Sequence, residues 1–266
     1  MTADPDLDLL ASAAKEAGGL ALTYFRRSPA VWVKENESPV SDADIAVDRL
    51  LSERLRAARP DYGWLSEETA DDSSRRGSHP VFIVDPIDGT REFLAGGKEW
   101  TISLAVVVDG RPAAAVLAAP AVGETFLASL GGGAILNGAP ITVRRREGLA
   151  GARLAGPRRY LRGVAEKAGV EAQAIRFIGS LAYRLALVAA DRIDVAVARE
   201  GSRDWDLAAA DLILQEAGGK LTDLAGRVLR YDRAETGHPS IVATTEGIGA
   251  EVRRLVAEEA AAFDIG

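Results

Sequence analysis

The chain has 266 residues, of which 47% are hydrophobic and 27% are charged, and it contains no cysteine, so it is expected to be globular and to lack disulfides, iron–sulfur clusters, thiolate zinc sites and cysteine nucleophiles. A net charge of -7 argues against general binding of nucleic-acid polymers. No apolar run reaches the roughly 20 residues of a membrane-spanning helix and Met1 to Asp8 has no basic start, so we expect a cytoplasmic protein without membrane insertion.

The first part of the chain is predicted to be helical. Leu9 to Phe25 is alanine-rich, with apolar residues at helical spacing. A second predicted helix runs from the N-cap Ser41 to about Ala58. On it, Asp44 and Asp48 share a line with apolar positions such as Leu51, so both acids are expected to face the interior and to need partners.

Predicted strands dominate the next part of the chain. Asp109-Gly110 and Asn137-Gly138 mark tight turns between extended segments, which indicates mostly antiparallel pairing. The predicted strands are Trp64 to Ser66, Val81 to Val84, Thr101 to Val108, Ala113 to Ala118 and Thr125 to Ala128.

From about Gly148 the pattern changes to short strands that alternate with helices, which is typical of an α/β layer. The predicted strands are Arg153 to Ala155, Ala174 to Phe177 and Val195 to Val197, and the predicted helices are Leu161 to Ala168, Leu181 to Ala190 and Trp205 to Ala217. We therefore predict an N-terminal α+β domain, residues 1–147, and a C-terminal α/β domain, residues 148–266.

The segment Asp85-Pro-Ile-Asp88-Gly-Thr90 follows a buried strand and precedes a helix predicted from Arg91. It places two carboxylates beside free backbone N–H groups. Carboxylates suit hard divalent cations, and N–H groups at the start of a helix suit an anion, so the segment fits a cation together with a phosphate. The structural alternative is that Asp-Pro and Asp-Gly are ordinary turn dipeptides.

Further acids stand at the edges of other predicted elements. Glu67-Glu68 follows the short strand that ends at Ser66, and Asp206 lies at the start of the helix that ends before Gly218-Gly219. Taken alone, the glutamate pair is typical of solvated surface, and Asp206 is typical of an acid that complements a helix dipole.

Together these segments resemble the signature motifs of the inositol monophosphatase superfamily, in the same order and at similar spacing. Supporting similarity extends from Pro39 to about Val242 and includes Gly131 to Gly138 and Gly179-Ser180. The resemblance implies an α/β fold of the layered α+β kind, a five-layer αβαβα sandwich. It also implies Mg2+-dependent hydrolysis of a small phosphomonoester, by a monomer or homodimer.

The resemblance also assigns roles to residues. Two or three Mg2+ ions would be held by Glu67, Asp85, the backbone carbonyl of Ile87, Asp88 and Asp206. Thr90 would hydrogen-bond the attacking water and Asp44 would polarise Thr90, so that these two and Glu67 are the predicted catalytic residues. Gly89 and Thr90 would offer backbone N–H groups to the phosphate, and Glu68 would support metal-bound water.

Two features favour a particular substrate. Asp88 to Phe93 and Glu99 to Thr101 resemble the 3'(2'),5'-bisphosphate nucleotidases, and Arg199 stands where inositol phosphatases place a glutamate. An arginine suits a second phosphate, so 3'-phosphoadenosine 5'-phosphate is the predicted substrate; the structural alternative is an exposed surface arginine, with the alignment shifted by one residue. The alternatives are inositol 1-phosphate or another sugar or polyol phosphate, and a non-catalytic sensor of nucleotides or cations.

Overall fold

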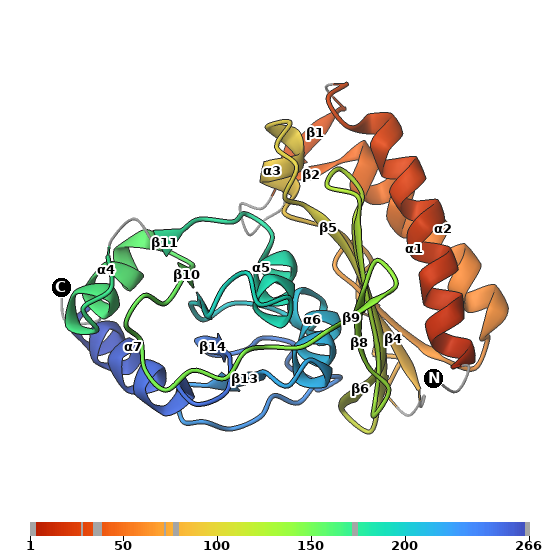
Figure 1. The fold of residues 1–266 in the computed structure, drawn as a ribbon. Coiled ribbons are helices and arrows are strands. Elements are labelled where there is room, and N and C mark those ends of the chain that lie inside the picture. The colour runs from red at the N-terminus through yellow and green to blue at the C-terminus, as the bar shows by residue number, and fades with distance from the viewer. Residues whose placement is uncertain are drawn as a thin grey trace.

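Two large β-sheets and three pairs of helices alternate as layers in the computed structural model (Figure 1). The structure describes residues 4–27, 29–33, 39–71, 73–76, 80–171 and 175–263. The helices are α1 (Pro5–Tyr24), α2 (Asp42–Ala58), α3 (Thr90–Leu94), α4 (Arg158–Lys167), α5 (Leu181–Ala189), α6 (Asp204–Glu216) and α7 (Gly249–Phe263). None of the described helices is long and apolar enough to cross a membrane.

The first large sheet has seven strands in the order β3-β4-β5-β6-β7-β8-β9, and all its pairs are antiparallel except β3 with β4. Its strands are β3 (Gly63–Ser66), β4 (Val81–Asp88), β5 (Thr101–Val108), β6 (Arg111–Ala119), β7 (Glu124–Ser129), β8 (Gly133–Leu136) and β9 (Ala139–Ile141). A separate two-stranded sheet pairs β1 (Val31–Val33) with β2 (Pro39–Ser41).

The second large sheet has five strands in the order β11-β10-β12-β14-β13 and mixes parallel with antiparallel pairs. Its strands are β10 (Leu154–Ala155), β11 (Ile175–Arg176), β12 (Val195–Ala198), β13 (Lys220–Asp223) and β14 (Ile241–Thr244).

Three buried clusters correspond to the interfaces between layers. On β4, Phe82 and Val84 pack with α1 and α2, while Val81 and Ile83 belong to the cluster with α5 and α6, because side chains alternate across a strand. A third cluster joins α4 and α7 to the outer face of the five-stranded sheet. The order α1–α2, sheet, α5–α6, sheet, α4–α7 is the predicted five-layer αβαβα sandwich (Figure 1).

The cluster around α5 and α6 includes residues of both sheets, such as Ile83 and Ala196. The seven-stranded sheet ends at Ile141 and the five-stranded sheet begins at Leu154. The division into domains 1–147 and 148–266 stays a prediction.

Most predicted elements are confirmed, with shifted ends. β4 continues through Asp88, beyond the predicted end at Val84, because Asp88 still pairs with Thr101 after a shift in register. Helix α4 begins at Arg158, before the predicted Leu161. Ala174, from the predicted strand that ends at Phe177, lies outside the described residues, as do Met1 to Ala3.

Candidate active site

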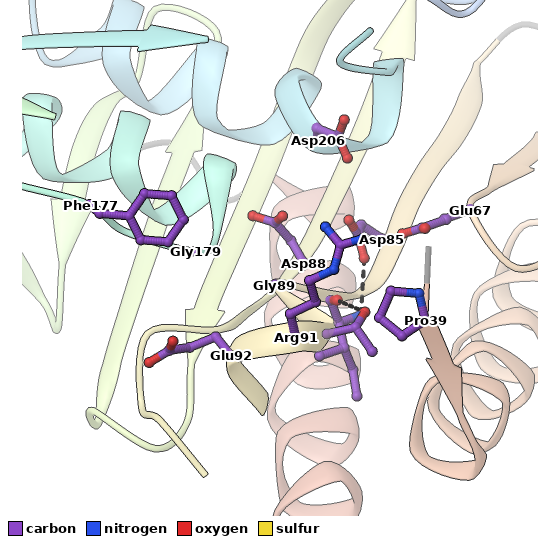
Figure 2. Close-up of a pocket in the computed structure, with 12 residues that line it drawn as sticks. Pro39, Glu67, Asp85, Asp88, Gly89, Arg91, Glu92, Phe177, Gly179 and Asp206 are labelled. Carbon is purple, nitrogen blue, oxygen red and sulfur yellow. Dashed lines mark hydrogen bonds between the residues drawn. The ribbon is translucent and has the colours of Figure 1, made fainter. Parts of the chain in front are cut away.

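Three aspartates meet at one end of β4. Asp85 and Asp88 come from β4, and Asp206 comes from the first turn of α6. One carboxylate oxygen from each lies within 4.8 Å of those of the other two. Figure 2 shows their side chains around a common pocket, which Glu67 also lines. The predicted ligands Asp85, Asp88 and Asp206 are therefore close in space although Asp206 is distant in sequence.

Asp85 is almost completely buried, with 1% of its surface exposed. Its Oδ1 accepts a hydrogen bond from the backbone N–H of Ile87 at 3.0 Å, whereas its Oδ2 is buried without a hydrogen-bond partner among the described residues. Burial raises the pKa of Asp85 well above its ordinary value, and the charges of Glu67 and Asp88 raise it further. A buried oxygen of this kind needs a partner that the described residues do not supply.

Asp88 is anchored by the start of α5. Its Oδ2 accepts hydrogen bonds from the Ser180 hydroxyl at 2.5 Å and from the Ala182 N–H at 2.7 Å. Burial nevertheless raises the pKa of Asp88 to about 6. Gly89 follows with a φ of 92°, and a Cβ there would lie 3.2 Å from Ser180, so glycine permits both the turn and this close approach.

Asp206 is positioned by the start of α6. Its Oδ2 accepts a hydrogen bond from the backbone N–H of Arg203 at 2.7 Å, which is the reciprocal half of a capping box. Burial raises the pKa of Asp206 well above its ordinary value, and the charge of Asp88 adds to the shift. The sequence suggested either an acid that complements the helix dipole or a metal ligand. The geometry is compatible with both, because Asp206 lies in the first turn of α6 and a carboxylate oxygen of Asp206 also belongs to the acidic cluster.

Thr90 and Asp44 lie together beside the carboxylates. The Thr90 hydroxyl is 3.2 Å from Asp44 Oδ1 and 3.1 Å from the carbonyl oxygen of Ile87. Asp44 Oδ2 accepts hydrogen bonds from the N–H and the hydroxyl of Ser41, at 2.8 and 2.6 Å. Burial raises the pKa of Asp44, although these hydrogen bonds oppose the shift. The capping box of α2 therefore fixes the acid that faces Thr90.

The two predicted glutamates differ in position. Glu67 lines the pocket, and its backbone N–H donates a hydrogen bond to the carbonyl oxygen of Val84 at 3.2 Å. Glu68 is outside the described pocket lining. Asp48, expected to face inward, accepts hydrogen bonds from Ser66 at 2.5 Å and Thr69 at 2.8 Å. Asp48 therefore connects α2 by hydrogen bonds to the residues on both sides of the glutamate pair. The predicted role of Glu68 stays a prediction.

Other residues of the pocket were not predicted as site residues. Pro39, Arg91, Glu92, Phe177 and Gly179 also line it (Figure 2). The signal for Arg91 and Glu92 was their place directly after Thr90, at the start of a predicted helix. Gly179 lies in the Gly179-Ser180 segment that supports the family resemblance, but it was given no role in the site. Phe177 gave no comparable signal, because the approach of its loop to β4 depends on packing between layers.

Arg199 was predicted to bind a second phosphate. It directly follows β12, it is exposed, and it is outside the described residues that line the pocket. Among those residues, the basic side chain is Arg91. The predicted role of Arg199 has no geometric support from this pocket.

The donor set of the site fits a hard divalent cation. Carboxylate and carbonyl oxygens are the ligands that such cations prefer, and one oxygen of the closely spaced aspartates, Asp85 Oδ2, has no hydrogen-bond partner among the described residues. A bound cation would offset the repulsion between these carboxylates and would give the Asp85 oxygen a partner.

Comparisons with known proteins agree with this architecture. The family model "Inositol monophosphatase family" matches residues 3–262. A protein named inositol-1-monophosphatase from Rhizobium meliloti is 40% identical, over 70% of this chain and 73% of its own. A histidinol-phosphatase from Chlorobaculum parvum is 36% identical, over 84% and 87%.

A solved structure shows the same fold. The extragenic suppressor protein suhB from Bartonella henselae superposes with a TM-score of 0.83 at 30% identity, over 95% of this chain and 98% of that protein. The match of the family model to nearly the whole chain is decisive, and the chain belongs to the inositol monophosphatase family.

Proposed function

We propose that the protein is a Mg2+-dependent phosphomonoesterase that releases inorganic phosphate from a small phosphorylated alcohol. The observation that carries this proposal is the meeting of Asp85, Asp88 and Asp206 within 4.8 Å of one another. Membership of a phosphatase family supports the reaction class. The pocket above these carboxylates, with a volume of about 350 Å³, suits a small ligand rather than a polymer.

Glu67, Asp85, the carbonyl of Ile87, Asp88 and Asp206 are the proposed ligands for two or three Mg2+ ions. When bound there, Mg2+ would supply positive charge to the phosphate oxygens and activate water. Asp88 Oδ2 is engaged by Ser180 and Ala182, so Oδ1 is the oxygen proposed for coordination.

Thr90 would orient the attacking water. Its hydroxyl has one proton and two acceptors within reach, Asp44 and the Ile87 carbonyl. If the Ile87 carbonyl faces a cation, the Thr90 proton points to Asp44, and the lone pairs of Thr90 are left to accept a hydrogen bond from water. The N–H groups of Gly89 and Thr90 would bind the phosphate at the start of α3.

For the substrate, 3'-phosphoadenosine 5'-phosphate stays the first proposal and inositol 1-phosphate the alternative. Arg91, which lines the pocket, takes over from Arg199 as the candidate cation for a second phosphate. The relatives named histidinol-phosphatase and inositol-1-monophosphatase make the corresponding esters necessary members of a substrate panel.

Phosphate release from this panel, with metal-stripped protein and after addition of Mg2+, tests the reaction class. We expect release only when Mg2+ is present. The absence of release from every ester at saturating Mg2+ would instead support the non-catalytic sensor.

Thr90→Ala tests the proposed role of the hydroxyl, with Thr90→Ser as the matched control. We expect kcat to fall by about 100-fold in the alanine variant while KM changes little, because orientation of water matters mainly in the transition state. The serine variant keeps the hydroxyl and should retain most activity. An unchanged kcat in Thr90→Ala would refute this role.

A further inference from the structure

Phe177 is an unusually exposed aromatic residue. With 62% of its surface exposed, it is the most exposed large hydrophobic side chain among the described residues. By contrast, Phe82, Phe93 and Phe126 are buried, and each contacts another aromatic ring. Exposure of a phenyl ring forfeits the stabilisation that burial would provide. Single exposed apolar residues are common on protein surfaces, so what distinguishes Phe177 is its place beside the carboxylates of the pocket.

The backbone on both sides of Phe177 is fixed. The carbonyl of Arg176 accepts a hydrogen bond from the N–H of Gly156 at 3.1 Å, and the Arg176 guanidinium pairs with Glu99. The carbonyl of Ile178 accepts a hydrogen bond from the buried guanidinium of Arg184 at 2.7 Å. These contacts fix the backbone from which the exposed ring projects.

Arg184 extends this anchorage into the second sheet. Its other terminal nitrogen donates to the carbonyl of Val197, on β12, at 2.9 Å. One buried side chain thus joins the loop of Phe177 to a strand of the five-stranded sheet. The exposed ring is carried by a fixed framework, so binding against it would cost little additional ordering.

The fixed position of the ring is at the pocket. Phe177 lines the same pocket as Asp85, Asp88 and Asp206. Figure 2 shows the ring on the side of Asp88 and Gly179, across the pocket from Glu67 and Pro39. A phosphate held at the carboxylates would therefore place its alcohol portion within the pocket that this ring borders.

We propose that Phe177 is a stacking surface for a flat, unsaturated ring in the alcohol portion of the substrate, such as a purine or an imidazole. This inference rests on the proposed phosphatase function, because the position of the phosphate sets the position of the ring. Planar heterocycles stack favourably on aromatic side chains. A polyol instead presents hydroxyl groups, which lose hydrogen bonds to water against an apolar face.

The test compares Phe177→Ala with Phe177→Tyr, which keeps the ring, and with Leu130→Ala, which shortens a side chain that is 59% exposed outside this pocket. kcat/KM is measured for 3'-phosphoadenosine 5'-phosphate, histidinol phosphate and inositol 1-phosphate. The first two esters distinguish a purine from an imidazole, and the third has no unsaturated ring.

We expect wild type to prefer one of the two ring-bearing esters. In Phe177→Ala, the ratio of its kcat/KM to that for inositol 1-phosphate should fall about 10- to 100-fold, mainly through KM. Phe177→Tyr and Leu130→Ala should keep the wild-type ratio. An unchanged ratio in Phe177→Ala, or a wild-type preference for inositol 1-phosphate, would overturn the inference.

A binding measurement separates this inference from the proposed function. Calorimetric titration with AMP and with histidinol needs no turnover. If wild type binds one of them and Phe177→Ala binds it at least about tenfold more weakly, the stacking inference is supported. If, in addition, no ester is hydrolysed, the proposed function fails while the stacking inference stands. If wild type hydrolyses esters but Phe177→Ala binds AMP and histidinol as wild type does, the stacking inference fails alone.

Discussion

Asp194 and Asp85 are equally buried, with 1% of each residue exposed, but their surroundings are opposite. Burial alone would raise the pKa of Asp194, yet hydrogen bonds and charge from Arg153, with charge from Arg146, hold it below its ordinary value. The Arg153 guanidinium lies 2.9 Å from Asp194. Around Asp85, burial and the neighbouring carboxylates all raise the pKa.

The difference distinguishes an acid whose charge the fold itself compensates from an acid that we propose binds a cation. A buried carboxylate that pairs with arginines has its charge compensated within the fold, and removing one member of such a pair destabilises the folded state. A buried carboxylate that packs beside other carboxylates is subject to electrostatic repulsion, and a cation bound from solution would reduce this repulsion. Four predictions test this contrast, in order of decreasing effect.

Asp88→Asn should abolish most activity, because the acidic cluster loses one charged oxygen ligand. We expect phosphate release at saturating Mg2+ to fall by at least about 100-fold, since loss of even an outer partner of a metal ligand costs 10- to 100-fold. Circular dichroism should show an unchanged fold. Asp8→Asn, at an exposed position on α1, is the matched control. A near-normal rate would remove Asp88 from the site.

Asp194→Asn should lower the free energy of unfolding by about 2 to 3 kcal/mol at neutral pH, because it leaves charged arginine donors without their anion. Because its folded pKa is depressed, the carboxylate stabilises the fold above its unfolded pKa, and this contribution is lost as pH falls below about 4. Urea unfolding measures both effects. Glu246→Gln, which removes an exposed ion pair with Arg145, should cost below about 0.5 kcal/mol.

Asp211 on α6 is intermediate between Asp194 and Asp85, because it has a neutral hydrogen-bond partner. The Tyr231 hydroxyl donates to it at 2.8 Å, while burial raises the pKa of Asp211 to about 6. Its folded pKa exceeds its unfolded value, so the native state binds more protons between about pH 4 and 6. Its contribution to stability therefore falls by about 2 to 3 kcal/mol as pH rises through this window. The stability difference between wild type and Asp211→Asn should carry this slope, and a difference independent of pH would contradict it.

Mg2+ should raise the melting temperature of the wild-type protein. At ten times Kd, a ligand that binds only the folded state adds about 1.4 kcal/mol, or about 3 to 5 °C for a chain of this size. Asp194→Asn should keep this increment and Asp88→Asn should lose most of it. Equal shifts in both variants would place cation binding elsewhere.

Some elements were not predicted, and several of these are very short. β1, β2 and β9 have three residues each, too few for a periodic pattern. β13, β14 and α7 follow the last predicted helix. The spacing of Val252, Leu255 and Val256 is the helical signal that indicates α7, and all three are buried.

The sequence determined the local chemistry of the site. A strand, the segment Asp85 to Thr90 and a helix follow one another directly in the sequence, and the N-cap Ser41 lies three residues before the Asp44 that it positions. Both features could be predicted because turns, caps and strand burial depend on near neighbours. Only the tertiary structure decided that Asp206 approaches Asp88 and that Ser180 anchors Asp88. It also decided that Phe177 borders the pocket and that Arg199 is exposed and outside the described residues that line the pocket. These outcomes depend on how α5 and α6 pack between two sheets, and local periodicity does not specify the register of that packing.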